Sequence, residues 1–221
     1  MEKDKLQQEK RAATYNQDGL EAYQNWDIDR AVDRFRAAVR LAPDQADYHL
    51  NLAKALARAG DFDQALRALG EFLRLEPNAE VAERLMQLFA SGLDAVENIV
   101  TEKMSAAGMP IEEIGAALHM WLEYRIALGR ETVNIRKPET WAAALDYTVR
   151  KVNLRPVTQR EIAELYGISP GVLRDHFESL VGVLDVMPCD YRYFVGEQNP
   201  LDKLVEAAEL LEQLEARFRE P

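Results

Sequence analysis

A 34-residue internal repeat constrains this sequence more than any other feature. Residues 12–45 align without a gap on residues 46–79, so the offset is 34 at every matched position. The closest matches lie in the second half of each repeat: Ala31 with Ala65, Phe35 with Leu69, Leu41 with Leu75 and Pro43 with Pro77. A repeat of this length is a supersecondary unit that cannot bury its apolar face alone and must stack on a neighbour.

The residue types within each repeat indicate a pair of antiparallel helices. Gly19 and Ala53 are small at the same repeat position, which lets two helices approach closely, and larger residues such as Phe35 fill the space beside them. Pro43 and Pro77 end the second helix, because proline lacks an amide donor and disfavours helix in the residue before it.

These residues resemble the tetratricopeptide repeat over positions 12–79. The resemblance implies stacked helical hairpins whose first helices line a concave groove for an extended peptide or a helix. Carried over by position, the peptide-groove residues are Asn16, Leu20, Tyr23, Gln24, Leu50, Asn51, Lys54, Ala57 and Arg58.

Two cations of this set predict the chemistry of the ligand. Lys54 and Arg58 lie one helical turn apart, so they could accept a carboxylate or an acidic peptide. The alternative is that both are solvated surface cations. The groove of two repeats is short, and the tail of the chain itself could fill it.

Two repeats leave an apolar face uncovered, so a further helix is expected next to them. Residues 80–90 show apolar positions at helical spacing and predict a capping helix that packs on the second helix of the second repeat. We therefore expect a charged extension at 1–11 and a repeat domain with its cap at 12–91.

The following residues predict a second, all-helical domain at 92–185. Helical periodicity runs through residues 93–106 and 110–129, and another helix starts at Pro138 and ends near Asn153. Thr158 and Glu161 then form a capping-box pattern, Gly167 ends that helix in a left-handed turn, and Ser169 caps the next one. This is the layout of a helix-turn-helix over residues 158–181.

Residues 139–180 resemble the last helices of the cyclin-like repeats of general transcription factor IIB. The resemblance rests on the Trp141-Ala-Ala-Ala helix followed by the helix-turn-helix. It implies a helical bundle that binds proteins and DNA and performs no chemistry. The expected fold is thus all-α, with repeat hairpins followed by a cyclin-like helical bundle.

A basic cluster beside this motif suggests nucleic acid as a partner. The candidate nucleic-acid or partner surface consists of Arg136, Lys137, Arg150, Lys151, Arg155, Gln159, Arg160 and Arg174. Against DNA stands the surface that the motif would expose, which has two cations and two acids, because phosphate contacts dominate DNA affinity. The alternative is a solvated face, with the helix-turn-helix retained for packing and protein contacts.

The sequence carries no pattern of a catalytic, metal or cofactor site. It has neither a phosphate-cradling glycine loop nor a nucleophile elbow, and the lone Cys189 has no activating base nearby in sequence. His49, His119 and His176 are interpreted as packing or surface residues. No signal peptide and no membrane-spanning segment is expected, which predicts a cytoplasmic protein with no membrane partner.

The last residues are expected to form a separate segment. Residues 186–200 read as a linker, and apolar residues from Leu201 to Phe218 predict an amphipathic helix within 186–221. That helix either docks on its own chain or pairs in a homodimer. Taken together, the sequence predicts a non-enzymatic protein–protein interaction adaptor. The alternative is a DNA-binding transcriptional regulator whose repeats recruit a partner protein.

Overall fold

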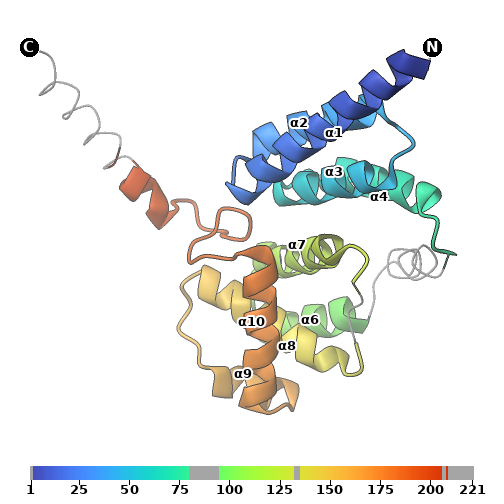
Figure 1. The fold of residues 1–221 in the computed structure, drawn as a ribbon. Coiled ribbons are helices and arrows are strands. Elements are labelled where there is room, and N and C mark those ends of the chain that lie inside the picture. The colour runs from blue at the N-terminus through green and yellow to red at the C-terminus, as the bar shows by residue number, and fades with distance from the viewer. Residues whose placement is uncertain (1, 80–94, 132–134, 206–207, 209–221) are drawn as a thin grey trace, which may run out of the picture. The chain divides into compact units, whose positions relative to one another are not determined.

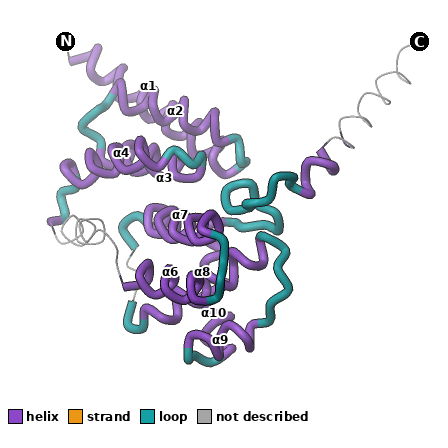
Figure 2. Tube along the Cα trace, turned by 180° about the vertical axis from the view of Figure 1, so that it is seen from behind, coloured by secondary structure: helices purple, strands orange, loops and turns teal. Residues whose placement is uncertain are grey.

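A computed structural model describes residues 2–79, 95–131, 135–205 and 208 of the chain. Every regular element longer than one turn within these residues is an α-helix, and loops and turns join the helices (Figure 2). The predicted all-α fold is therefore confirmed for the part of the chain that the structure describes.

The chain divides into two compact units that share one helix. The first unit contains residues 1–94 and 122–134, and the second contains residues 95–121 and 135–221. Helix α7, Ile111–Leu128, therefore begins in the second unit and ends in the first. The sequence had placed residues 92–185 in one helical domain.

The first unit contains two helical hairpins at the positions of the two repeats (Figure 1). Their helices are α1 (Glu2–Gln24), α2 (Ile28–Leu41), α3 (Ala46–Arg58) and α4 (Phe62–Leu75), with α1 packed on α2, α3 on α4 and α2 on α3. Residues 2–11, expected as a charged extension, belong to α1. The helix pairs predicted from the 34-residue repeat are thus present.

The two hairpins turn in the same way at equivalent positions. Asp27 and Asp61 each cap the second helix, because their carboxylates accept hydrogen bonds from the backbone amides three residues later. The preceding residue is left-handed in both turns, at Gly60 with φ +80° and at Trp26 with φ +61°. This backbone is easy for glycine and costs energy for tryptophan, so the first repeat retains Trp26 at a conformational cost.

Close approach of α1 and α2 explains the small residue at position 19. A Cβ atom added to Gly19 would lie 2.6 Å from Cε1 of Phe35, which is less than van der Waals contact allows. Phe35 is buried at 1% exposure and belongs to the same apolar core as Leu56, Leu69 and Phe72. The glycine therefore lets an aromatic ring lie directly against the α1 backbone.

The second unit is arranged around helix α8 (Pro138–Val152), which is buried along most of its length. Three helices pack on it: α6 (Ala95–Ala106), α9 (Gln159–Tyr166) and α10 (Pro170–Leu184). Small residues at positions 142–144 are fully buried and allow this close packing. The helices expected at 93–106, 110–129 and 138–153 are therefore present within one or two residues of their predicted ends, as far as they are described.

A buried carboxylate of α8 forms an ion pair within that helix and a hydrogen bond to α9. The Asp146 carboxylate is fully buried, and Nε of Arg150 lies 2.6 Å from its Oδ1. The hydroxyl of Tyr166 donates to Oδ2 of Asp146 at 3.1 Å. Burial raises the pKa of Tyr166 far above its ordinary value, and Asp146 raises it further, so the phenol is a permanent donor in this network.

Helices α9 and α10 are joined by the short turn that the sequence predicts. Thr158 and Glu161 form the capping box, Gly167 is left-handed with φ +66°, and the Ser169 side chain caps α10 by accepting from the Val172 amide. The capping box, the left-handed glycine and the cap of α10 that the sequence predicts within residues 158–181 are thus all present.

Two predicted elements lie outside the described residues. These are the capping helix at 80–90 and most of the amphipathic helix from Leu201 to Phe218, of which residues 201–205 and 208 are described as helical. None of the helices that the structure describes is both long and apolar enough to cross a bilayer.

Candidate partner-binding groove

The predicted groove residues lie on the two first helices of the repeats. Asn16, Leu20, Tyr23 and Gln24 are on α1, and Leu50, Asn51, Lys54, Ala57 and Arg58 are on α3. Nδ2 of Asn51 donates to Oδ1 of Asn16 at 2.9 Å, so one hydrogen bond joins the two helices across this face.

The same face contacts a segment of the chain that is distant in sequence, residues 122–131 of α7 and the following turn. Ile126 is buried at 1% exposure in the core of the repeats, and Leu122 packs against that core. Gly129 ends the helix with φ +58°, and a Cβ atom added to it would lie 3.2 Å from Cδ2 of Leu50 and 3.3 Å from Cε of Lys54. Glycine therefore fits this position both by backbone conformation and by the closeness of α3.

Arg58 is the centre of the contact. Its guanidinium carbon lies 4.4 Å from the ring centroid of Tyr23 and 4.6 Å from that of Trp26, within the range of cation–π attraction. Its Nε lies 3.7 Å from Oε1 of Glu123, and the two side chains are only 8% and 3% exposed. The structure therefore places Arg58 in a buried pair with a carboxylate of the chain itself.

Lys54 lies next to this pair in a strongly positive surrounding. Burial lowers the pKa of its amine, Glu131 raises it in part, and the charges of Arg130 and Arg58 lower it further. The net pKa is below the ordinary lysine value, so the ammonium form is disfavoured here more than on an open surface.

Arg130 holds the end of the segment to the repeats. Its Nη1 lies 2.6 Å from Oδ1 of Asp47 on α3, and its Nε donates to Oε2 of Glu76 at 2.8 Å. The guanidinium also lies 5.1 Å from the ring centroid of Phe72. Burial alone would lower the pKa of Arg130, but the hydrogen bonds to the two carboxylates raise it above the ordinary value.

Sequence reasoning did not identify this occupant. It had considered the tail of the chain, whereas the structure places residues 122–131 against the groove residues. The apolar spacing of Leu122 and Ile126 signals any amphipathic helix. Charge pairs that join Arg58 to Glu123, or Asp47 to Arg130, leave no local sequence signal.

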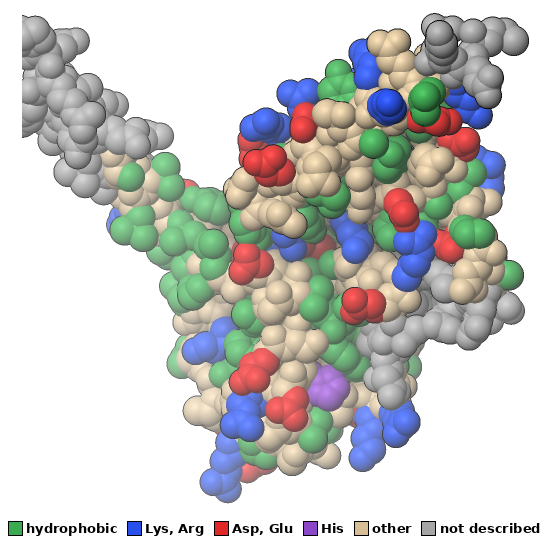
Figure 3. Space-filling view, viewed as in Figure 1, with side chains coloured by type: hydrophobic (Ala, Val, Ile, Leu, Met, Phe, Trp, Pro, Cys, Tyr) green, Lys and Arg blue, Asp and Glu red, His purple; other side chains and the backbone are tan. Residues whose placement is uncertain are grey.

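The basic cluster of the second unit is largely paired with acids. Arg150 pairs with Asp146, Arg155 with Glu113 at 2.6 Å, Arg160 with Glu164 at 2.9 Å and Arg174 with Glu178 at 3.9 Å. Arg136 and Lys137 line a hollow of about 750 Å³ beside the turn between α9 and α10. On the face shown in Figure 3, acidic and basic side chains are interspersed over this unit. Such pairing weakens the field that would attract a phosphate backbone.

His49, His176 and Cys189 lie in packed environments, and the His119 side chain is exposed. Nε2 of His49 lies 2.9 Å from the Pro43 carbonyl oxygen, and the ring of His176 meets the ring of Trp141 edge-on with centroids 4.6 Å apart. Cys189 is buried. Within the residues that the structure describes, no group of three or more His, Cys, Asp or Glu side chains is arranged to hold a metal ion.

Residues 17–80 and 50–91 match the tetratricopeptide-repeat family. Residues 17–91 are therefore a tetratricopeptide-repeat segment, and such repeats indicate a role in protein–protein interaction. The chain is also similar to the uncharacterized protein YccF of Bacillus subtilis strain 168, with 30% identity over 127 residues. The match covers 56% of this chain and only 35% of YccF, so the chain spans about a third of that relative. No solved structure matches the chain.

Proposed function

We propose that the protein is a non-enzymatic adaptor that binds a helix of a partner protein in the groove between α1 and α3. The observation that carries this proposal is the segment 122–131, which lies against the predicted groove residues as a bound helix would. It presents Leu122, Glu123 and Ile126 on one face of the helix, and Arg130 follows in the turn after the helix ends.

The contacts define what a partner helix needs in order to replace this segment. Two apolar side chains enter the repeat core, and burying each contributes about 1.5–3 kcal/mol. A carboxylate at the position of Glu123 is required beside Arg58, because a buried guanidinium without a counter-charge is strongly unfavourable. The apolar residues thus supply affinity, and the acid supplies selectivity.

The proposal is tested with a fluorescein-labelled peptide of residues 118–131 added to the full chain. In a Glu123→Lys chain, repulsion from Arg58 weakens the internal segment, so we expect the labelled peptide to bind at least about tenfold more tightly than to the wild type. Fluorescence anisotropy measures the affinity, and circular dichroism verifies that the variant is folded.

A charge-swapped peptide provides the control. In a chain with both Arg58→Glu and Glu123→Lys, the internal segment is paired with α3 again, by reversed charges. The wild-type peptide should therefore bind this chain more weakly than it binds the Glu123→Lys chain. A peptide that carries Glu123→Lys should not displace the internal segment, because both offer the same lysine. If the opened Glu123→Lys chain binds the wild-type peptide no better than the wild-type chain does, the groove does not act as a helix receptor.

A second candidate is a DNA-binding regulator that uses residues 158–181, favoured by the short turn between α9 and α10 and by the resemblance to factor IIB. The ion pairs of Arg150, Arg155, Arg160 and Arg174 with acids reduce its electrostatic support. A mobility-shift assay on random duplexes at low salt tests it. Reversing the charges of Arg150, Lys151 and Arg155 should abolish any shift, and no shift at micromolar protein would eliminate this candidate.

A further inference from the structure

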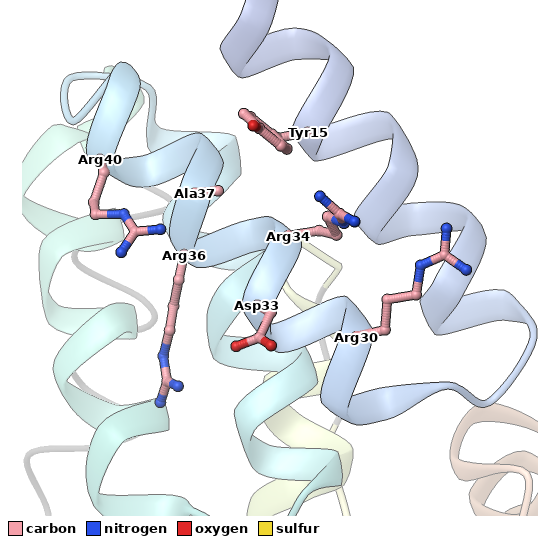
Figure 4. A pocket seen from close by; sticks show the side chains of 7 residues that line it. All are labelled: Tyr15, Arg30, Asp33, Arg34, Arg36, Ala37 and Arg40. Atoms are coloured by element: carbon pink, nitrogen blue, oxygen red, sulfur yellow. The ribbon is translucent and has the colours of Figure 1, made fainter.

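The outward face of α2 carries four arginines in two pairs. Arg30 and Arg34 are one turn apart, as are Arg36 and Arg40, and Asp33 and Ala37 lie between the two pairs (Figure 4). Together with Tyr15 of α1 these residues line an open hollow of about 720 Å³. The Ala37 side chain is a single methyl group, so it leaves space between the longer arginine side chains.

Two of the arginines are held in place by neutral partners. The guanidinium carbon of Arg34 lies 5.7 Å from the ring centroid of Tyr15, and Nη2 of Arg36 donates to Oε1 of Gln64 at 2.8 Å. Within the described residues, none of the four guanidinium groups forms an ion pair. Four neighbouring arginines that form no ion pair among the described residues stand out in a chain with 38 acidic residues.

Packing of the repeat does not require these arginines. The buried face of α2 consists of Ala31, Val32, Phe35 and Ala38, and the arginines point away from it. The second repeat shows what the fold tolerates: the positions 34 residues later are Gln64, Ala68, Gly70 and Arg74. The one cation among them, Arg74, is paired with Glu71 at 2.8 Å. The basic face is therefore specific to the first repeat.

We propose that this face of α2 binds an acidic segment of a partner protein. Arginine presents a planar fork that matches a carboxylate with two parallel hydrogen bonds. Arg30 and Arg40 are about 15 Å apart along the helix axis, which an extended peptide of about five residues would span. The ligand is thus a short stretch with carboxylates toward both ends, one for each arginine pair.

Asp33 between the pairs favours a peptide over nucleic acid. A duplex carries one negative charge per about 1.7 Å, so its backbone would meet the carboxylate of Asp33 as well as the arginines. An acidic peptide can leave a neutral or basic residue at that point. The formal charge of −11 also disfavours a long polyanion more than a short one.

This inference rests on the proposed adaptor function, since an adaptor with its groove filled needs another surface for its partner. The two are separable because the face of α2 does not include the groove residues. The test uses the full chain and a fluorescein-labelled peptide of sequence Glu-Glu-Gly-Glu-Glu, with a Gln-Gln-Gly-Gln-Gln peptide as the neutral probe. Affinity is measured by anisotropy over a range of salt concentrations.

Charge reversal of the exposed arginines provides the decisive comparison. A chain with Arg30→Glu and Arg40→Glu should bind the acidic peptide at least about tenfold more weakly than the wild type. The matched control has Arg67→Glu and Arg74→Glu on the exposed face of α4, which gives the same net charge, and should retain affinity within about twofold. Binding should weaken as salt rises, because the arginines are solvent-accessible.

Three results would overturn the inference: equal loss in the control chain, equal binding of the neutral peptide, or a random duplex that binds more tightly than the acidic peptide and depends on the same arginines. The last would assign the face to nucleic acid. The anisotropy of the 118–131 peptide with the Glu123→Lys chain, in which α2 is unchanged, reports on the groove separately. If that chain fails to bind the 118–131 peptide but still binds the acidic peptide, the groove proposal is removed and the α2 face remains.

Discussion

The groove and the outer face of α2 both carry cations, yet they use them in opposite ways. In the groove, Arg58 is buried, lies against two aromatic rings and is paired with Glu123 of the same chain. On α2, the arginines are accessible, and those that have contacts touch neutral groups. A cation on a repeat helix thus stabilises the fold in one place and remains available to a ligand in the other, and only the contacts distinguish the two.

The largest effect is expected where the groove is filled by an apolar side chain. Ile126→Ala removes most of a side chain that is 1% exposed in the repeat core, so we expect a loss of about 4 kcal/mol in the free energy of unfolding. Urea denaturation followed by circular dichroism measures it. Ile111→Ala on the same helix, where the side chain is 71% exposed, should change the free energy by less than about 0.5 kcal/mol. Equal effects would mean that residues 122–131 do not fill the groove.

The buried pair gives the next largest expected effect. Glu123→Ala leaves Arg58 buried without its carboxylate, which should cost about 3 kcal/mol in unfolding free energy. Glu112→Ala removes an exposed carboxylate from the same helix and is the matched control. Arg30→Ala on α2 should have almost no effect on stability, in keeping with a face that folding does not need. A large loss in Arg30→Ala would invalidate the comparison between the two surfaces.

The close approach of α1 and α2 stabilises the repeat that carries both the groove and the basic face of α2. Adding a single methyl group at Gly19 tests how much this close packing contributes. Gly19→Ala places a methyl group against the buried ring of Phe35, and we expect about 2 kcal/mol of destabilisation. Gly70→Ala introduces the same methyl group on α4, where no heavy atom lies within 4 Å, and should stabilise the helix by about 0.5–1 kcal/mol. Thermal melts measure both effects: the melting temperature should fall in Gly19→Ala and rise in Gly70→Ala. A fall in both variants would contradict the difference in packing between the two repeats.

The smallest effect concerns the pH dependence of Lys54. Because burial lowers the pKa of Lys54 in the folded chain below its ordinary value of 10.5, the unfolded chain binds the proton more tightly. Its ammonium form therefore destabilises the fold at neutral pH, and stability should rise as pH increases toward 10.5. Lys54→Met should remove this rise in stability between pH 7 and pH 10. Lys151→Met, at an exposed position, serves as the control, and an unchanged pH slope in Lys54→Met would contradict the assignment.

The local elements were predictable from the sequence, since their signals are local. The 34-residue offset predicts the four repeat helices, and Thr158, Glu161 and Gly167 predict the ends of α9. The Asn16–Asn51 hydrogen bond also joins two residues that the repeat positions had assigned to one groove.

The occupancy of the groove was not predictable in the same way. Arg58 and Glu123 are far apart in sequence, and nothing near either residue specifies the other. The ring of Trp26 adds to this contact from a strained left-handed turn, which the sequence shows only as an aromatic residue where the second repeat has Gly60. The basic face of α2 is visible as four arginines, but their lack of acidic partners depends on three-dimensional placement.

The covalent attachment of residues 122–131 to the repeats they contact has a quantitative consequence. A tethered ligand acts at an effective concentration of about a millimolar, however dilute the protein is. A free helix of equal intrinsic affinity at micromolar abundance would then capture only about one groove in a thousand. Under the proposed function, the groove would therefore respond to a partner that is anchored nearby at a second point, and it would not capture a helix that meets it only weakly in solution.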